Sequence, residues 1–350
     1  MVLYLVGLGD LVEGELMTRT PQIPRLRVPV VALAVATGVA GSVPAAHATF
    51  PGTPGPIAFQ RFVDPQDEEN SQIFSVSRPG AKARRLTSGG NGFNPDYSPD
   101  GERIVFERRF GGMMPDAIFT MEADGSSPAV VRTTCVADPC LGDSSPAWAP
   151  DGNRLVFERA FGPIVQDNAA GLDLVTANVD GSNEQVILHF RSLEAQGKEP
   201  HDAQWSPDGT RIAVNILNIK AKPRNGSAIY VLDADGSDLR RITPFRLNAG
   251  NPDWSPDGRR IAFNSSYEGQ AAVEIYTVRP NGRGLKRVRN NPVKSFSFEP
   301  VWSPNGKRIA FAHATARTAP HIWTMKRNGT ALRQITRGRK PDVRPDWGSR

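Results

Sequence analysis

One short phrase, Trp-Ser-Pro-Asp-Gly or a near copy of it, recurs along the chain every 45 to 57 residues. The copies start at Tyr97, Trp148, Trp205, Trp254 and Trp302, and a shortened sixth copy starts at Trp347. Self-similarity at a period of this size is typical of solenoids and propellers. The repeat therefore restricts the possible folds more strongly than any local pattern in the chain.

Each repeat contains two predicted hairpins. In the fifth repeat the first turn runs from Ser303 to Gly306, where proline presets φ and glycine accepts a left-handed conformation. The second turn is marked by Asn328 and Gly329, a strong signal for a short hairpin. Two hairpins give four short strands per repeat, which is the content of one propeller blade.

The second strand of each repeat is apolar on both faces. In the fifth repeat Ile309 and Phe311 share one face and Ala310 lies on the other, and the earlier repeats follow the same pattern. A sheet needs two apolar faces when it packs against a neighbour on each side. The recurring aromatic residues are expected to be buried between blades for the same reason.

The number of blades follows from the incomplete repeats at the two ends. Five complete repeats start at Asn94, Ser145, Asp202, Asn251 and Glu299. Residues 56–87 lack a first strand, and residues 344–347 contain only a first strand. We expect the C-terminal strand to complete the first blade, which also removes open sheet edges. The prediction is an all-β fold, a six-bladed β-propeller spanning residues 56–350.

The N-terminus has the organisation of a secretory signal peptide. A basic flank at Arg25 and Arg27 precedes an apolar stretch from Val28 to Ala40, and 46–48 read Ala-His-Ala. The apolar stretch is too short for a membrane-spanning helix and suits a signal peptide. We predict a signal peptide over 1–48, with Met17 as the candidate true start, and a short linker over 49–55. The mature chain is expected to lack a transmembrane segment and to be periplasmic, cell-wall-associated or extracellular.

The only two cysteines, Cys135 and Cys140, lie close together between the second and third blades. In an exported protein, a disulfide that closes this short loop is the first hypothesis. A zinc site would need nearby histidines, and a redox site would usually have a Cys-x-x-Cys spacing. The pair is therefore interpreted as a structural staple.

The net charge is +6, and removal of residues 1–48 leaves it unchanged. The basic groups are not clustered with aromatic residues, so nucleic acid is not expected as a partner. An anionic polymer of the envelope stays open as an alternative partner. No cofactor is expected, and the protein is expected to be a monomer.

The repeats N-P-D-W-S-P-D-G and E-P-V-W-S-P-N-G, each followed by a strand such as R-I-A-F, resemble the TolB-type β-propeller repeat. The resemblance extends over residues 56–347. TolB proteins dock an outer-membrane lipoprotein at the mouth of their channel, and the repeat also resembles propellers of prolyl-oligopeptidase-like enzymes and polysaccharide lyases. TolB proteins carry an α/β domain before the propeller, whereas here only the short linker precedes the first strand. The resemblance thus implies an exported propeller without that domain.

The innermost strand of each blade should line the central channel. Its leading positions are Asn94, Ser145, Asp202, Asn251, Glu299 and Arg344. Three of these, Asp202, Glu299 and Arg344, depart from the asparagine found at Asn94 and Asn251, so the scaffold alone does not explain them. Together with Asn94, Asn251 and the adjacent His201, they form the candidate binding site at the channel mouth.

The same ring of side chains permits other interpretations. Carboxylates and amides could hold a cation such as calcium, or they could cap strand ends and turns without binding anything. The latter reading is favoured for Asp96 and Asp253, which belong to the repeat signature. Four long loops, at 108–116, 160–171, 189–201 and 217–227, are expected to shape the rim of the mouth.

No catalytic signature is present: the chain has no Gly-x-Ser-x-Gly elbow, His-Glu-x-x-His helix or phosphate loop. The leading hypothesis is a non-enzymatic exported scaffold that binds a protein or peptide of the cell envelope through its channel mouth and rim loops. The alternative is a hydrolase or lyase acting on a carbohydrate or lactone with a channel-bound metal. No catalytic or metal-binding residue is assigned.

Overall fold

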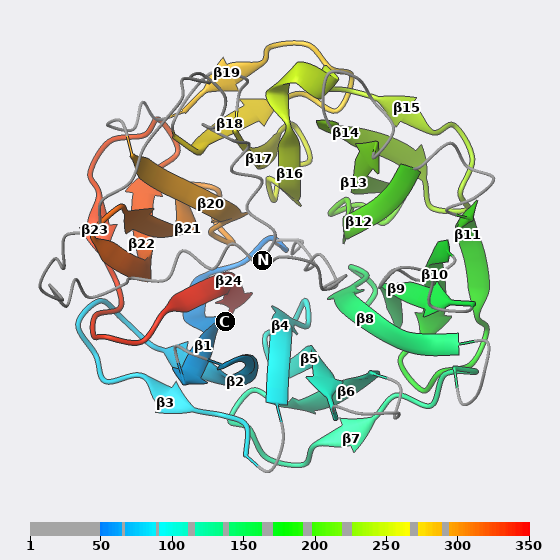
Figure 1. The fold of residues 1–350 in the computed structure, drawn as a ribbon, viewed down its shortest axis with the longest axis horizontal. Helices are drawn as coiled ribbons and strands as arrows, with labels where there is room; N and C mark the ends of the chain where they lie inside the picture. Colours follow the sequence, from blue (N-terminus) through cyan, green and yellow to red (C-terminus); the bar gives the residue numbers. More distant parts are fainter. Residues whose placement is uncertain are drawn as a thin grey trace, which may run out of the picture.

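Six four-stranded antiparallel sheets surround a central axis (Figure 1), which confirms the six-bladed β-propeller. The structure is a computed structural model that describes residues 50–64, 67–88, 91–110, 116–135, 140–162, 171–191, 198–218, 226–266, 272–288 and 294–350. The predicted signal peptide lies outside these residues. In the part of the chain that is described, no helix is both long and apolar enough to cross a membrane.

Each blade is numbered by its place in the ring, and its strands are given from the axis outward. Blade 1 contains β24 (Asp342–Ser349), β1 (Pro54–Asp64), β2 (Asp67–Val76) and β3 (Arg84–Arg85). Blade 2 contains β4 (Asn91–Tyr97), β5 (Arg103–Arg109), β6 (Ala117–Glu122) and β7 (Ala129–Val130). Blade 3 contains β8 (Cys140–Trp148), β9 (Arg154–Phe161), β10 (Gly171–Asn178) and β11 (Gln185–Arg191).

The other half of the ring follows the same order. Blade 4 contains β12 (Lys198–Trp205), β13 (Arg211–Asn218), β14 (Gly226–Asp233) and β15 (Arg240–Arg241). A short 3-10 helix, η1 (Phe245–Leu247), leads into blade 5, which contains β16 (Ala249–Trp254), β17 (Ile261–Ser265), β18 (Glu274–Val278) and β19 (Lys286–Arg287). Blade 6 contains β20 (Ser295–Trp302), β21 (Arg308–Thr315), β22 (Thr318–Lys326) and β23 (Arg333–Gln334).

The two ends of the described chain close the ring by sharing blade 1, as predicted. Strand β1 pairs antiparallel with β24, so that Ile57 lies opposite Trp347 and Arg61 lies opposite Asp342. The Arg61 guanidinium also donates two hydrogen bonds to the Asp342 carboxylate, at 2.6 and 2.9 Å. This charged pair reinforces the backbone ladder at the point of closure.

The second strands form the core between blades. In β21, Ile309, Ala310 and Phe311 are all fully buried, and the equivalent triplets in blades 2 to 5 are fully buried too. Successive strand residues point to opposite faces, so both faces of every sheet are covered by a neighbouring blade. This confirms the prediction made from the two-sided apolar pattern.

Both predicted turns are present, and the second has an additional role. The Gly306 N–H donates to the Ser303 carbonyl at 2.7 Å, and Gly306 has a φ of 64°. Gly329 has a φ of 86°, and a Cβ at this position would lie 2.1 Å from the Val288 carbonyl of blade 5. The second glycine is therefore required by contact with the preceding blade as well as by its turn.

The two ends of the propeller differ in their connections. All Ser-Pro-Asp-Gly turns and second hairpin turns lie at one end, which we call the turn face, because strands alternate in direction. The other end, the loop face, receives the β5–β6 type connections and the links between blades. The central parts of the predicted rim loops, 111–115, 163–170, 192–197 and 219–225, lie outside the described residues. Strand β1 begins at Pro54, within the span predicted as linker.

Candidate functional site

The six inner strands share one backbone irregularity at the candidate site. Each leading residue has a left-handed φ, between 45° and 60° in every blade; these residues are Asn94, Ser145, Asp202, Asn251, Glu299 and Arg344. The pairing with the second strand shifts register at the same point in all six blades, as in a β-bulge. A left-handed φ is uncommon outside glycine, so its repetition in all six blades indicates that this backbone conformation is part of the blade architecture.

The bulge turns the backbone N–H of the leading residue toward an acceptor from the preceding blade. The Asp202 N–H donates to Glu158 Oε1 at 2.8 Å, and the Glu299 N–H donates to Asn264 Oδ1 at 3.1 Å. The Arg344 N–H donates to Glu299 Oε2 at 2.7 Å. These bonds connect successive blades around the axis, so the backbone of the candidate site belongs to the scaffold.

The three residues that depart from the repeat meet on the channel axis. Arg344 Nε lies 2.9 Å from Glu299 Oε1, and Arg344 Nη1 lies 3.8 Å from Asp202 Oδ1. Arg344 is in blade 1 and Asp202 is in blade 4, which lies on the opposite side of the ring (Figure 1). All three residues are buried. The ion pairs therefore bridge the channel at this level.

The two asparagines of the candidate site keep hydrogen-bonding atoms that the described residues do not use. Asn94 Nδ2 donates to Glu107 Oε2 at 2.8 Å, but Asn94 Oδ1 has no hydrogen-bond partner among those residues. The Asn251 N–H donates to Asp202 Oδ2 at 3.3 Å, and Asn251 Nδ2 likewise has no hydrogen-bond partner in the described part of the chain. Buried polar groups are normally paired, so these two atoms are among the exceptions in the described part of the chain.

His201 lies next to the ion pairs and is buried between two carboxylates. Its Nδ1 is 3.3 Å from Glu158 Oε2, and its Nε2 is 3.5 Å from Glu199 Oε2. Burial opposes the charged imidazolium, but the hydrogen bond with Glu158 and the negative charges of Glu158 and Glu199 outweigh it and raise the pKa of His201 to about 10. His201 is therefore charged at neutral pH and serves as a counter-ion within the site.

Asp202 titrates near neutrality. Burial disfavours its charged form, and the nearby Glu158 adds to this effect, while Arg344 and His201 oppose it; the resulting pKa is about 7. A perturbed carboxyl group inside a charged cluster is a common mark of functional sites. The charge on the channel axis thus changes within the physiological pH range.

The signature carboxylates Asp96 and Asp253 have a structural role. Asp96 Oδ2 accepts the Trp148 N–H at 2.7 Å, and Asp253 Oδ2 accepts the Trp302 N–H at 2.6 Å. Each bond joins one blade to the inner strand of the next. The sequence predicted that they cap strand ends and turns, and the structure gives them the inner strand of the next blade as partner.

One end of the channel is covered by the start of the described chain. The Gly52 N–H donates to the Pro304 carbonyl in blade 6 at 3.1 Å. Phe50 is buried in the hydrophobic cluster that includes Trp148 and Ala149 of blade 3, on the opposite side of the ring. Residues 50–53 therefore cross the axis at the turn face, and the blue start of the chain lies near the centre of Figure 1. The sequence pattern contained no signal for this segment beyond its position.

The predicted disulfide is present between Cys135 and Cys140, whose Cα atoms are 5.4 Å apart. Asp143 lies beside it and is held by two hydrogen bonds from Arg159, at 2.7 and 2.9 Å. Within the described residues, Cys135, Cys140 and Asp143 are the one group of His, Cys, Asp or Glu side chains close enough to share a metal ion. Since both thiols are used in the disulfide, this group is a staple.

Sequence reasoning missed the two second-strand carboxylates Glu107 and Glu158, which hold the ring together. A signal existed, because both follow the buried Phe106 or Phe157 directly, and the equivalent position in blade 5 is Asn264. A polar residue directly after the buried triplet of the second strand recurs in five of the six blades, as Gln60, Glu107, Glu158, Asn215 and Asn264, and three of these (Glu107, Glu158 and Asn264) accept the N–H of the next blade's bulge.

A family model agrees with this geometry. The model described as the TolB beta propeller domain matches residues 164–350, just over half of the chain. The chain belongs to the TolB beta-propeller domain family. Among curated proteins, an uncharacterized protein of Agrobacterium fabrum is 33% identical over 144 residues, which cover 40% of this chain and 45% of that relative. The match thus spans less than half of the relative's length.

Solved structures with the TolB-type fold are similar in architecture. TolB from Acinetobacter baumannii has a TM-score of 0.65 at 17% identity, over 85% of this chain and 67% of that one. The putative TolB from Agrobacterium tumefaciens has a TM-score of 0.57 at 20% identity, over 81% and 90%. An oligogalacturonate lyase in complex with manganese has a TM-score of 0.50 at 15% identity, over 82% and 74%. At these identities the likeness concerns the fold alone.

Proposed function

We propose that this TolB-family propeller is exported and binds a protein or peptide of the cell envelope through the channel mouth at the loop face and the loops around it. The observation that carries the proposal is the buried polar ring on the axis. Its ion pairs join Arg344 to Glu299 and Asp202, and Asn94 and Asn251 keep hydrogen-bonding atoms unused among the described residues. Polar groups of this kind fix the orientation of a ligand in a concave site.

The loop face is the preferred side because the turn face is covered. Phe50 and the residues that follow it occupy the axis at the turn face. A peptide backbone offers alternating N–H donors and C=O acceptors, which match the amide of Asn251 and the carbonyl of Asn94. Export is supported by the disulfide between Cys135 and Cys140, since disulfides persist in oxidising compartments.

A cross-linked pull-down from the envelope of the source organism tests this proposal, with residues 49–350 as bait. The triple variant Asp202→Ala, Glu299→Ala, Arg344→Ala removes the ion cluster as a unit, because removing one partner alone would leave an unpaired buried charge. We expect one protein to be captured by the native bait and lost with the triple variant. Capture that is equal with both baits would overturn the role of the ring.

The matched control is Asp253→Asn, which weakens a bond between blades without touching the ion cluster. This variant should keep the partner even though its melting temperature falls. Loss of the partner with Asp253→Asn as well as with the triple variant would show that only the stability of the fold matters.

A second candidate function rests on the titratable cluster of Asp202, His201 and Glu158. A carboxyl group with a pKa of about 7 next to a charged imidazole is suited to proton transfer, as in a hydrolase or lyase acting on a carbohydrate or lactone. Metal analysis of the purified, dialysed protein tests this alternative. A stoichiometric ion that is lost with Asp202→Asn would favour an enzyme with a channel-bound metal over the scaffold.

A further inference from the structure

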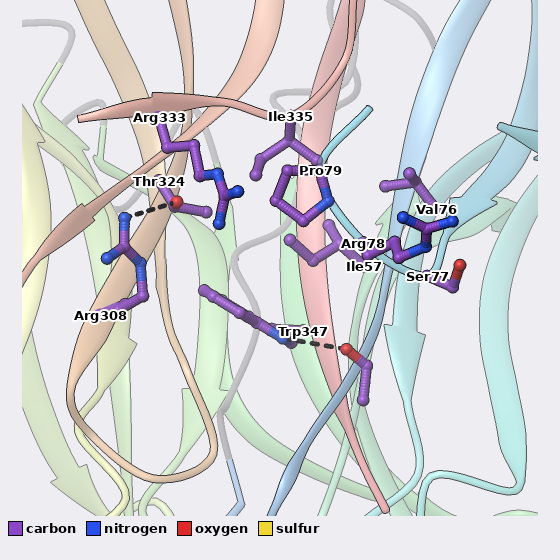
Figure 2. A pocket seen from close by; sticks show the side chains of 11 residues that line it. Ile57, Val76, Ser77, Arg78, Pro79, Arg308, Thr324, Arg333, Ile335 and Trp347 are labelled. Carbon is purple, nitrogen blue, oxygen red and sulfur yellow. Dashed lines mark hydrogen bonds between the residues drawn. The ribbon is translucent and has the colours of Figure 1, made fainter. Parts of the chain in front are cut away.

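The junction between blades 6 and 1 contains a cavity of about 190 Å³ at the turn face (Figure 2). Strands β1, β2 and β24 of blade 1 line one side, and β21, β22 and β23 of blade 6 line the other. The other junctions have no such gap in their turn contacts, because the second-turn glycine of each blade from 2 to 6 lies against the preceding blade. The cavity therefore lies where this turn contact is missing, at the closure of the ring.

The cavity exists because the second turn of blade 1 is shifted. Here the Ala81 N–H donates to the Arg78 carbonyl at 3.1 Å, whereas in blade 2 the Gly125 N–H donates to Glu122, one position earlier in the repeat. A Cβ on Gly80 would meet nothing within 4 Å, whereas one on Gly125 would lie 2.5 Å from Leu86 of blade 1. The shifted turn leaves the space that the other blades fill.

The floor of the cavity is apolar and includes a partly exposed aromatic ring. Trp347 is only half-buried, although the equivalent Trp148, Trp205 and Trp254 are fully buried. Its indole N–H donates to the Gly55 carbonyl at 3.2 Å, so one edge of the ring is fixed. Ile57 and Ile335 extend the apolar lining on one side of the indole, above it in Figure 2.

Three arginines surround this floor. Arg308 and Arg333 lie on the blade 6 side and Arg78 lies on the blade 1 side, with Trp347 between them (Figure 2). Arg308 is held in place by hydrogen bonds to Thr324 Oγ1 and the Ala331 carbonyl, both at 2.9 Å. Within the described residues, none of the three arginines forms an ion pair with a carboxylate.

The positive charges are close enough to influence each other. Burial lowers the pKa of Arg308, and the charge of Arg333 lowers it further. In blades 2, 3 and 4 the equivalent arginines instead lie over the tryptophan of the next blade, with 4.7 to 5.1 Å between guanidinium and ring centre. In blade 5, Arg260 bonds to Thr277 and Gly284 of its own blade, as Arg308 bonds within blade 6, but Trp302 of the next blade is buried whereas Trp347 is only half-buried.

We propose that this cavity is a binding site for a carboxylate carried on an apolar body. Planar guanidinium groups bind carboxylates with charge-assisted, often bidentate, hydrogen bonds, and the indole with Ile57 and Ile335 covers the apolar part. The volume suits a group about as large as one amino-acid residue, well below that of a whole drug-sized ligand. Two sources share this chemistry: the C-terminal residue of a peptide, and a small organic acid. This site is separate from the channel mouth at the loop face, because the cavity lies between blades 6 and 1 at the turn face.

Titration of the protein with matched small probes tests the proposal, and the indole N–H resonance of Trp347 in a ¹⁵N-labelled sample serves as the reporter, assigned with Trp347→Phe. N-acetyl-leucine presents a carboxylate on an apolar body, and N-acetyl-leucinamide has the same body without the charge. We expect the acid to shift the Trp347 signal and the amide to bind about tenfold more weakly or not at all. Equal binding of acid and amide, or no shift with either, would overturn the proposal.

Further probes separate the two sources of the ligand. Benzoate represents a small organic acid, and a tetrapeptide ending in leucine represents a peptide C-terminus. Tighter binding of the tetrapeptide than of N-acetyl-leucine assigns the site to peptides, and tighter binding of benzoate assigns it to small acids. Glucuronate carries its carboxylate on a polar body. If glucuronate bound more tightly than all the apolar acids, the proposed role of the indole would be contradicted.

Two arginine variants connect the binding to the cavity. Arg333→Gln changes an exposed side chain and should leave the fold intact while weakening N-acetyl-leucine binding about tenfold. Arg103→Gln is the matched control, because Arg103 occupies the equivalent position to Arg308 but lies over Trp148 in another junction. Unchanged binding in Arg333→Gln, or an equal loss in Arg103→Gln, would sink the assignment.

Discussion

The junction between blades 3 and 4 and the junction between blades 6 and 1 are built from the same repeat but differ in packing. In the first, Arg154 lies 4.8 Å from the ring centre of Trp205, which is fully buried, and Gly236 contacts Ile187 of blade 3. In the second, Arg308 bonds within its own blade and Trp347 is half-buried. We call these the sealed junction and the open junction.

The difference teaches that the repeat specifies a blade more strictly than it specifies a junction. The arginine, the tryptophan and the turn glycine are present on both sides of the comparison. The open junction arises from a change of one residue in turn position, seen in the bond from the Ala81 N–H to Arg78. A small shift at the surface therefore determines whether a tryptophan becomes core or becomes part of a binding site.

Truncating the two tryptophans should give the largest contrast. Trp205→Ala removes a fully buried ring and is expected to cost about 3–5 kcal/mol of unfolding free energy, whereas Trp347→Ala should cost less because its ring is only partly buried. Urea unfolding at equilibrium measures both. Equal losses would mean that the open junction is as tightly packed as the sealed one.

The turn glycines provide the next test. Gly236→Ala combines a left-handed φ with a Cβ placed 2.2 Å from the Ile187 carbonyl, so we expect a loss of about 2 kcal/mol or more. Gly80→Ala is expected to lose only about 1 kcal/mol, from the left-handed backbone conformation, because a Cβ at this position would meet no atom within 4 Å. Thermal unfolding of the two variants side by side measures the difference. A larger loss at Gly80 than at Gly236 would contradict the contrast in packing.

A pH titration separates the open junction from the channel. Burial raises the pKa of Asp202 to about 7, above that of an unfolded aspartate, so its contribution to stability is complete at acidic pH and is lost as pH rises through 7. Asp202→Asn mimics the neutral form and should lose less stability than the native protein between pH 5 and 8. Anion binding at the open junction should stay constant over that range, because guanidinium groups remain charged. Identical pH profiles for native protein and Asp202→Asn would exclude a neutral Asp202.

The arginines should give the smallest effect. Arg154→Gln removes a cation–π contact with Trp205 and is expected to cost about 0.5–1 kcal/mol and to change tryptophan fluorescence. Arg308→Gln should leave the tryptophan fluorescence unchanged in the absence of ligand, because Arg308 bonds to Thr324 and Ala331. A fluorescence change of the same size in both variants would remove the distinction between the two junctions.

The sequence predicted the blades well because its signals were local. The turn at 303–306 and the alternation of Ile309, Ala310 and Phe311 depend on neighbouring residues, and six copies reinforce each other. The partner of Arg344 could not be read in the same way. Periodicity places Arg344 and Asp202 on inner strands, but the length and direction of a side chain determine that they meet across the axis.

The contacts between blades were the least predictable part. Gly329 was explained as a turn residue, although it also lies against Val288 of the preceding blade. The open junction depends on a shift of the turn near Arg78, where the chain reads Arg-Pro-Gly and the other repeats read Asp-Gly or Asn-Gly. An unusual turn in one copy of a repeat is thus the kind of signal that could have pointed to it.

The pairing of β1 with β24 also sets the order in which the molecule can be completed. Pro54 and Ser349 are partners in this sheet, so nearly the whole described chain forms the loop between them. Closing a loop of this length costs about 5 kcal/mol of chain entropy, and contacts of such large sequence separation form slowly. During synthesis blade 1 keeps an unpaired edge until the last strand has emerged. Blade 1 can therefore close only after β24 is available, so the sheet that joins the two ends of the described chain forms late in folding.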